Sequence, residues 1–162
     1  MALEIERKFL VKNDAWRGLG TTVAIRQGYL SRDVERTVRV RTKDDKGFLT
    51  IKGKNNGAVR TEFEYPIPHD EADAMLDTLA LRPIIEKTRT KIEYAGKLWE
   101  VDCFFGENDG LVLAEVELAS ENESVALPEW IGDEVTHLPR YYNSSLSEHP
   151  YSLWSDEEKA QR

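Results

Sequence analysis

Apolar and polar side chains alternate every second residue along most of this chain, a pattern that is typical of β-strands. Side chains two residues apart on a strand lie on the same face, so the alternation separates an apolar face from a polar one. Eight segments follow this pattern: Leu3–Val11, Val23–Leu30, Arg36–Lys43, Phe48–Lys52, Val59–Ile67, Ile85–Tyr94, Lys97–Phe105 and Leu111–Leu118. Eight short strands joined by short turns predict an antiparallel barrel or sandwich.

Turn residues and helical periodicity account for the segments between these strands. Asp44–Gly47 and Tyr94–Lys97 have the composition of hairpin turns, and Asn55–Gly57 links two more strands. In His69–Leu81 the apolar residues recur at helical spacing, which predicts a helix. Shorter helices are predicted at Ser120–Ala126 and Asn143–Ser147.

The polar faces of these strands are unusual because they carry charged residues in strict i, i+2 order. The charged or polar sets, strand by strand, are Glu4, Glu6 and Lys8; Arg39 and Arg41; Thr50 and Lys52; Arg60, Glu62 and Glu64; Lys87, Arg89 and Lys91; Glu100 and Asp102; Glu115 and Glu117. On a single strand such a face is usually solvated. If all of them turn inward, they line a charged tunnel, whose charges must be paired or bind ions because unpaired buried charges are costly. We therefore expect a mainly β (α+β) fold: a closed eight-stranded antiparallel β-barrel with a few peripheral helices.

Size and charge narrow the function classes. The chain has 162 residues, a net charge of -8 and one cysteine, Cys103. An acidic surface disfavours nucleic acid as a partner, and a lone cysteine excludes an intramolecular disulfide or a cysteine-based zinc site. No apolar run is long enough to span a membrane, and the first residues do not resemble a signal peptide. We expect a cytoplasmic protein with a single domain over residues 1–150 and a polar tail over residues 151–162.

The N-terminal strand carries a motif that points to a known family. Glu4-Ile5-Glu6-Arg7-Lys8 has the form E-x-E-x-K, and the chain resembles the CYTH superfamily of triphosphate tunnel metalloenzymes, in particular its short bacterial inorganic triphosphatases. Further motifs that match the family follow in order: Arg39-x-Arg41, Thr50-x-Lys52, Arg60-x-Glu62-x-Glu64, Glu86-Lys87-x-Arg89, Glu100-x-Asp102 and Glu115-x-Glu117. The resemblance is weaker towards Arg140–Asn143. Short bacterial members of the family often have an acidic residue and a lysine in the segment that corresponds to Thr136–Ser145. This chain has neither there. The resemblance therefore does not imply a substrate contact from the helix that is thought to plug one end of the tunnel.

The charged faces contain both kinds of group that triphosphate chemistry needs, cations around the phosphates and oxygen ligands for metal. The candidate phosphate ligands are Lys8, Arg39, Arg41, Lys52, Lys87 and Arg89. The candidate metal ligands are Glu4, Glu6, Glu64, Asp102, Glu115 and Glu117. Carboxylates without a histidine or cysteine cluster favour Mg²⁺ or Mn²⁺. Two ions are plausible, one on the phosphates and one that activates water.

Four residues are candidates for catalysis. Glu6 or Glu117 would orient the attacking water, and Tyr29, if its strand faces inward, would hydrogen-bond Lys87 and shape attack or protonation of the leaving group. Simple strand packing is the equal alternative for Tyr29. The remaining polar and aromatic residues have plainer expected roles. Arg60 and Glu62 are expected only to pair with neighbours; Lys91, Glu93, His69, His137 and His149 to be solvated; and Trp16, Trp99, Trp130 and Trp154 to pack.

Several activities occur on the fold that the chain resembles. The favoured activity is metal-dependent hydrolysis of a small-molecule triphosphate, with inorganic tripolyphosphate cleaved to pyrophosphate and phosphate by a monomer or homodimer. The alternatives are a thiamine or nucleoside triphosphatase, a class IV adenylate cyclase, and a non-catalytic module that binds polyphosphate or nucleotide. The chain has no added segment that clearly suits adenine and ribose, and its paired acids are retained.

Overall fold

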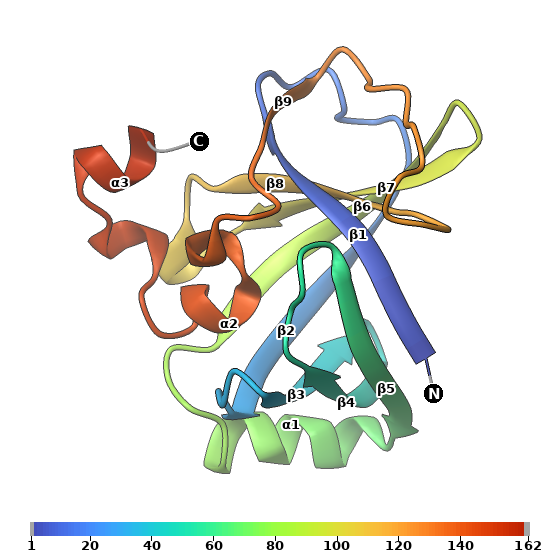
Figure 1. The fold of residues 1–162 in the computed structure, drawn as a ribbon. Helices are drawn as coiled ribbons and strands as arrows, with labels where there is room; N and C mark the ends of the chain where they lie inside the picture. Colours follow the sequence, from blue (N-terminus) through green and yellow to red (C-terminus); the bar gives the residue numbers. More distant parts are fainter. Residues whose placement is uncertain (1, 161–162) are drawn as a thin grey trace.

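The computed structural model describes residues 2–160, and its centre is a closed antiparallel β-barrel (Figure 1). The nine strands are β1 (Ala2–Val11), β2 (Thr21–Ser31), β3 (Arg36–Lys43), β4 (Lys46–Gly53), β5 (Val59–Ile67), β6 (Ile85–Tyr94), β7 (Lys97–Phe104), β8 (Val112–Glu117) and β9 (Ile131–Glu134). Eight of them follow in the order β5-β4-β3-β2-β6-β7-β8-β1, and the pairing of β1 with β5 closes the ring. The predicted closed eight-stranded barrel is therefore confirmed.

Strand β1 is the closing strand, because it pairs with three others. Its first residues pair with β5, with Glu4 opposite Arg60, and its later residues pair with β8, with Lys8 opposite Glu115. Beyond the end of the β5 pairing, β9 continues along β1, where the Val135 amide donates to the Lys8 carbonyl at 2.8 Å. The sequence pattern did not predict β9, since a strand of four residues is too short to show alternation.

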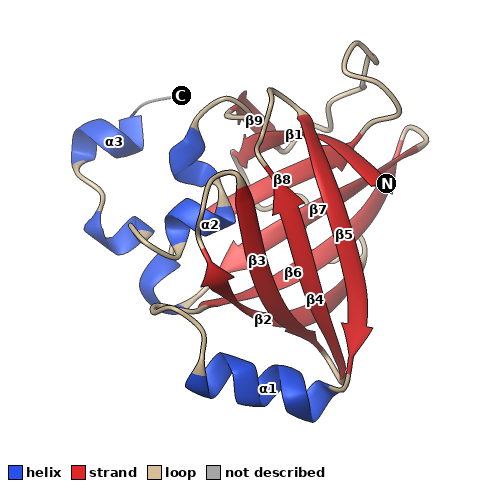
Figure 2. Ribbon diagram, turned by 60° about the horizontal axis from the view of Figure 1, so that its bottom comes forward, coloured by secondary structure: helices blue, strands red, loops and turns tan. Residues whose placement is uncertain are grey.

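Within residues 2–160, three α-helices and three short 3₁₀ turns lie around the barrel strands. They are α1 (His69–Thr78), α2 (Asn143–Leu146), α3 (Asp156–Ala160), η1 (Gly106–Asn108), η2 (Pro139–Tyr141) and η3 (Tyr151–Leu153). Figure 2 shows α1 against the wall of the barrel and the C-terminal helices gathered on one side. Within residues 2–160 we find no helix with the length and apolar character that crossing a membrane requires.

Helix α1 is shorter than its predicted range, which extended to Leu81. The chain leaves the helix after Thr78, and the Leu81 amide donates to the Tyr29 carbonyl at 2.9 Å, so the last predicted residues attach to β2 instead. Ala72 and Leu76 of α1 pack on Val40 of the barrel wall.

The predicted helix at Ser120–Ala126 is wrong, whereas the one near Asn143 is confirmed. The Glu123 side chain accepts from the Ala119 amide at 2.7 Å and pairs with Lys97, and Val125 packs on the core. These interactions hold the segment in a turn followed by extended backbone.

The apolar faces of the barrel strands point outward. Loops and helices cover much of this outer surface, whereas Ile51, Phe63 and Tyr65 of β4 and β5 stay exposed. Phe9, Trp99, Trp130 and Trp16 belong to one buried cluster, in which the Phe9 and Trp99 ring centroids lie 5.5 Å apart. Trp154 packs edge-on against Tyr141 in a second cluster, at 5.1 Å between centroids. All four tryptophans are thus packing residues, as the sequence predicted. Because the apolar faces take the outside, the charged faces are left to line the inside.

Candidate active site

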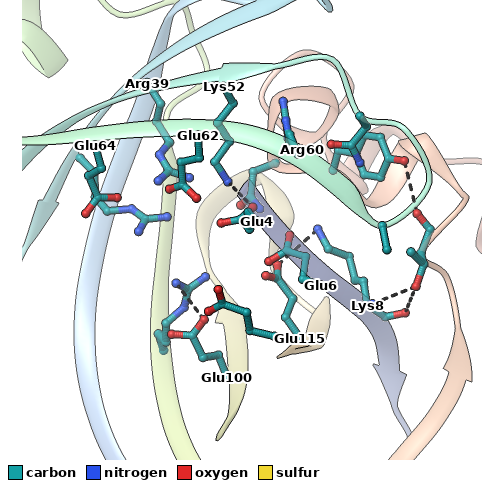
Figure 3. Close-up of a pocket in the computed structure, with 18 of the residues that line it drawn as sticks. Glu4, Glu6, Lys8, Arg39, Lys52, Arg60, Glu62, Glu64, Glu100 and Glu115 are labelled. Carbon is teal, nitrogen blue, oxygen red and sulfur yellow. Dashed lines mark hydrogen bonds and ion pairs between the residues drawn. The ribbon is translucent and has the colours of Figure 1, made fainter. Parts of the chain in front are cut away.

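A cavity of about 270 Å³ lies inside the barrel and is lined mainly by charged side chains (Figure 3). Each of the eight barrel strands contributes at least one polar side chain to it. The lining contains all but two of the residues that the sequence predicted for the site: Glu4, Glu6, Lys8, Tyr29, Arg39, Arg41, Lys52, Glu64, Arg89, Glu115 and Glu117. The alternation therefore predicted which face of each strand turns inward.

The two predicted residues outside the lining are Lys87 and Asp102, which pair with each other in the barrel wall. Lys87 Nζ lies 2.7 Å from Asp102 Oδ2, and Arg89 holds the same carboxylate with Nε at 2.7 Å and Nη2 at 2.9 Å. Although burial opposes ionisation, these two cations hold the pKa of Asp102 well below its usual range. Burial lowers the pKa of Lys87 to about 7 despite the attraction of Asp102. The Asp102 carboxylate thus serves two cations, which leaves it poorly placed to bind a metal.

The cationic part of the lining is crowded. Burial, together with the neighbouring Arg39 and Arg89, lowers the pKa of Arg41 to about 9. Arg41 Nε donates to Gln27 Oε1 at 2.9 Å, and Arg39 Nη2 donates to Thr50 Oγ1 at 3.3 Å. Arg39 is only 6% exposed, and its Nε is a buried donor without a hydrogen-bond partner in the described structure. Crowded, incompletely satisfied guanidinium groups are suited to an anion with several oxygens.

The acidic part of the lining centres on Glu4, Glu6 and Glu115, here called the carboxylate cluster (Figure 3). Lys52 Nζ lies 3.0 Å from Glu4 Oε1, and Lys8 Nζ lies 3.4 Å from Glu115 Oε1. Burial, together with the Glu115 and Glu4 carboxylates, raises the pKa of Glu6 well above its usual value. Lys8 and Arg89 outweigh the burial of Glu115 and hold its pKa well below its usual value. The cluster therefore carries more carboxylates than its lysines compensate.

The carboxylate cluster fits a hard divalent cation, because its donors are all oxygen and its negative charge is in excess. Within residues 2–160 no three acidic, histidine or cysteine side chains already converge as a group that could hold a metal ion. The ammonium groups of Lys52 and Lys8 lie beside Glu4 and Glu115, on the oxygens that an ion would contact. Binding of an ion would therefore require these lysines to move away from the carboxylates.

Arg60 and Glu62 were expected only to pair with neighbours, but both also line the cavity. Arg60 Nε donates to the Gly53 carbonyl at 2.9 Å, so this side chain does make the neighbour contacts. Burial and a hydrogen bond with Glu4 raise the pKa of Glu62 to about 7. Lys91 and Glu93, expected to be solvated, lie outside the lining: Glu93 is exposed, whereas Lys91 is half-buried.

The sequence did not predict the lining residues that come from loops and from α2. They are Asn55, Gly57 and Ala58 before β5, and Thr136, Tyr142 and Asn143 after β9. Asn143 Oδ1 accepts from Lys87 Nζ at 3.1 Å and from Gln27 Nε2 at 3.0 Å. These residues lie outside the alternating strands, so no periodic signal could identify them.

Tyr29 lies on the inward face of β2, is 5% exposed and lines the cavity. Lys87 donates to Asn143 and pairs with Asp102, and within residues 2–160 no hydrogen bond joins it to Tyr29, the contact that the sequence suggested. The three histidines lie outside the lining: His137 and His149 are exposed and His69 is partly buried.

Comparison with known proteins agrees with this architecture. An inorganic triphosphatase from Acetivibrio thermocellus is 51% identical over 156 residues, which cover 96% of this chain and 100% of the relative. An inorganic triphosphatase from Nitrosomonas europaea is 37% identical over 152 residues, covering 89% and 96%. The crystal structure of the inorganic triphosphatase NE1496 superposes with a TM-score of 0.67 at 35% identity, covering 91% of this chain and 95% of that one. The model of the CYTH domain matches residues 2–150, and this chain therefore belongs to the CYTH family.

Proposed function

We propose that this chain hydrolyses inorganic tripolyphosphate to pyrophosphate and phosphate inside its barrel. The observation that carries the proposal is the cavity of about 270 Å³ inside the barrel, in which guanidinium and carboxylate groups lie within one small space. The proposal is supported by the names of two relatives that match nearly the whole chain at 51% and 37% identity.

The charge balance of the cavity favours a polyanion that enters together with a metal. Among the lining residues in the described range 2–160, six are cationic and seven are acidic. A triphosphate brings several negative charges, which the cations alone would not neutralise beside so many carboxylates. A divalent cation on the acidic side balances both the carboxylates and the phosphates.

The phosphate cradle that we propose consists of Arg39, Arg41, Lys52, Lys8 and Arg89, all of which line the cavity. Arginine presents a planar fork that can pair with two phosphate oxygens, whereas lysine offers a point charge. The unpartnered Nε of Arg39 is a donor that a phosphate oxygen would satisfy. Lys87, beside the cavity-lining Asn143, would reinforce the positive potential from behind the lining.

Membership of the family implies a divalent metal ion, and we propose Mg²⁺ or Mn²⁺. Its ligands would be the carboxylate cluster with Glu64 and Glu117, which also line the cavity. When bound, the ion neutralises phosphate charge and lowers the pKa of a bound water. Glu6 or Glu117 would orient the attacking water, and Tyr29, which faces the same cavity, would protonate or position the departing phosphate.

The proposal also covers the location, the partners and the oligomeric state of the protein. The net charge of -8 gives little attraction for nucleic acid or for an anionic membrane surface. We propose a cytoplasmic monomer or homodimer that acts on a small molecule, with the site contained in residues 1–150.

A panel of substrates tests the proposed function. The purified protein is incubated with tripolyphosphate, ATP or thiamine triphosphate, each with Mg²⁺ or Mn²⁺, and the products are resolved by ion chromatography. Orthophosphate and pyrophosphate from tripolyphosphate, at a higher kcat/KM than for the organic triphosphates, is the expected result. Pyrophosphate with cyclic AMP from ATP would identify a cyclase instead, and binding without turnover would identify a binding module.

A further inference from the structure

The side chain of Asn143, the first residue of α2, links this helix to two cations of the site. Its Oδ1 accepts from Lys87 Nζ at 3.1 Å and from Gln27 Nε2 at 3.0 Å, and Gln27 Oε1 in turn accepts from Arg41 Nε at 2.9 Å. Lys87 and Gln27 are buried, so solvent does not readily replace these bonds. The Asn143 Oδ1 thus accepts a hydrogen bond directly from Lys87 and is linked to Arg41 through Gln27.

The chemistry of the donors dictates the direction of every bond in this network. Arginine Nε–H can only donate, so Gln27 must turn Oε1 towards Arg41 and therefore presents its NH₂ to Asn143. Lys87 Nζ donates to the same Asn143 oxygen. The network therefore requires an acceptor at residue 143 and has no use for a donor there.

We propose that Asn143 is a positioning residue for the phosphate-cleaving site: its Oδ1 holds Lys87 directly and Arg41 through Gln27. This inference rests on the proposed triphosphatase function. With Nε fixed on Gln27, the terminal nitrogens of Arg41 keep one orientation at the cavity that Arg41 lines. Fixed donors stabilise charge that develops in the transition state more than they strengthen binding of the ground state. Loss of the acceptor should therefore lower kcat more than it raises KM.

Helix α2 has attachments that do not depend on the Asn143 side chain. Leu146 is fully buried in the cluster around Phe104 and Tyr141. Arg32 Nε donates to Ser147 Oγ at 2.9 Å, and its Nη2 donates to the Ser147 carbonyl at 2.6 Å. A substitution at Asn143 can thus remove the acceptor while α2 stays in place, and a substitution at Arg32 loosens α2 without touching the network.

Three variants separate positioning from docking. Asn143→Leu removes the acceptor at similar size, and Asn143→Asp keeps an acceptor oxygen. Arg32→Gln weakens the docking of α2, together with the 3.0 Å bond from Arg32 to the Arg82 carbonyl, and leaves the Asn143 network intact. We expect Asn143→Leu to lower kcat for tripolyphosphate roughly tenfold, the effect of one lost hydrogen bond to a charged group, with a smaller change in KM. Asn143→Asp should recover most of kcat. Arg32→Gln should lower the thermal stability but leave kcat close to that of the unsubstituted protein.

An NMR measurement that does not depend on catalysis tests the positioning role separately from the proposed function. In ¹⁵N–¹H spectra of the metal-free protein, the Arg41 Nε–H signal, assigned by its loss in Arg41→Lys, should be sharp in the unsubstituted protein and in Asn143→Asp. It should broaden or shift in Asn143→Leu. An unsubstituted protein that turns over no triphosphate would refute the proposed function alone. An unchanged Arg41 signal in Asn143→Leu, an unchanged kcat, or equal defects in Asn143→Leu and Arg32→Gln would overturn the positioning role.

Discussion

Replacement of Arg39 by lysine should separate the geometry of the phosphate cradle from its charge. Arg39 is 6% exposed, its Nη2 donates to Thr50 Oγ1 at 3.3 Å, and its Nε is buried without a partner in the described structure. Arg39→Lys keeps one positive charge but removes the fork that can hold two phosphate oxygens. A charge-assisted hydrogen bond contributes about 1.5–3 kcal/mol. We therefore expect kcat/KM for tripolyphosphate to fall about tenfold to a hundredfold.

The same substitution should not destabilise the protein in the absence of substrate. A buried donor without a partner costs about 1–3 kcal/mol, and Arg39→Lys removes that donor. We expect the midpoint of thermal unfolding without substrate to stay constant or rise, while the upward shift that tripolyphosphate causes becomes smaller than in the unsubstituted protein. Steady-state kinetics and differential scanning fluorimetry measure the two effects.

Lys91→Ala is the matched control, because Lys91 lies two residues from Arg89 on the same strand but outside the cavity lining. This variant should keep most of the activity. An Arg39→Lys enzyme with unchanged kcat/KM, or a Lys91→Ala enzyme with an equal defect, would refute the assignment of Arg39 to the phosphate cradle. A fall in stability that accompanied the fall in activity would instead show that the arginine is chiefly structural.

Three further predictions concern the acidic residues. Asp102→Asn removes the counter-ion of two buried cations and should therefore lower the free energy of unfolding by about 3–5 kcal/mol. Urea titrations without metal measure this loss. A weaker metal affinity at unchanged stability would instead identify Asp102 as a metal ligand. A chelator should abolish activity, and added Mg²⁺ or Mn²⁺ should restore it. The Glu115→Ala variant should stay inactive even with added metal and should bind Mn²⁺ weakly in calorimetry. Full activity in the presence of chelator would contradict the proposed role of the acidic residues. The pKa of Glu62 rises from 4.5 to about 7 on folding, so the folded state binds the extra proton and stability falls as pH rises through that window. Glu62→Gln should flatten this fall in metal-free urea titrations, and an unaltered pH dependence would exclude Glu62 as its source.

The inward faces of the strands could be predicted from the sequence because a β-strand has a period of two. Val38 and Val40 alternate with Arg39 and Arg41, and a shift of one residue would have placed the valines in the cavity and the arginines among the apolar residues outside. Local alternation thus determines which side chains enter a barrel. It gives no information about loops, which is why Asn143 and Thr136 were missed.

The pairing of Asp102 was available in the sequence, although the charge pattern alone did not show it. A two-residue turn places Tyr94 opposite Lys97, and counting back along both strands places Arg89 opposite Asp102. In the structure Arg89 holds this carboxylate with two hydrogen bonds. Glu115 belongs to a similar i, i+2 pair, but across its strand it faces Lys8 in the cavity lining. Register therefore predicts the cation that faces each of these two carboxylates. It does not predict which carboxylate lines the cavity, because Glu100 lines it although its partner Lys91 does not.

One acidic and one cationic side chain of the cavity have pKa values shifted against their charged forms. Burial and neighbouring acids raise the pKa of Glu6, and burial and neighbouring guanidinium groups lower the pKa of Arg41 to about 9. The folded protein thus disfavours the charged forms of these two groups, whereas Lys8 and Arg89 keep the neighbouring Glu115 ionised. In addition, the Arg39 Nε is a buried donor without a partner in the described structure. A polyanion on the cations and a divalent ion on the acids would relieve both sides at once. Binding of the two should therefore be cooperative, with the folded barrel stabilised more by both together than by either alone.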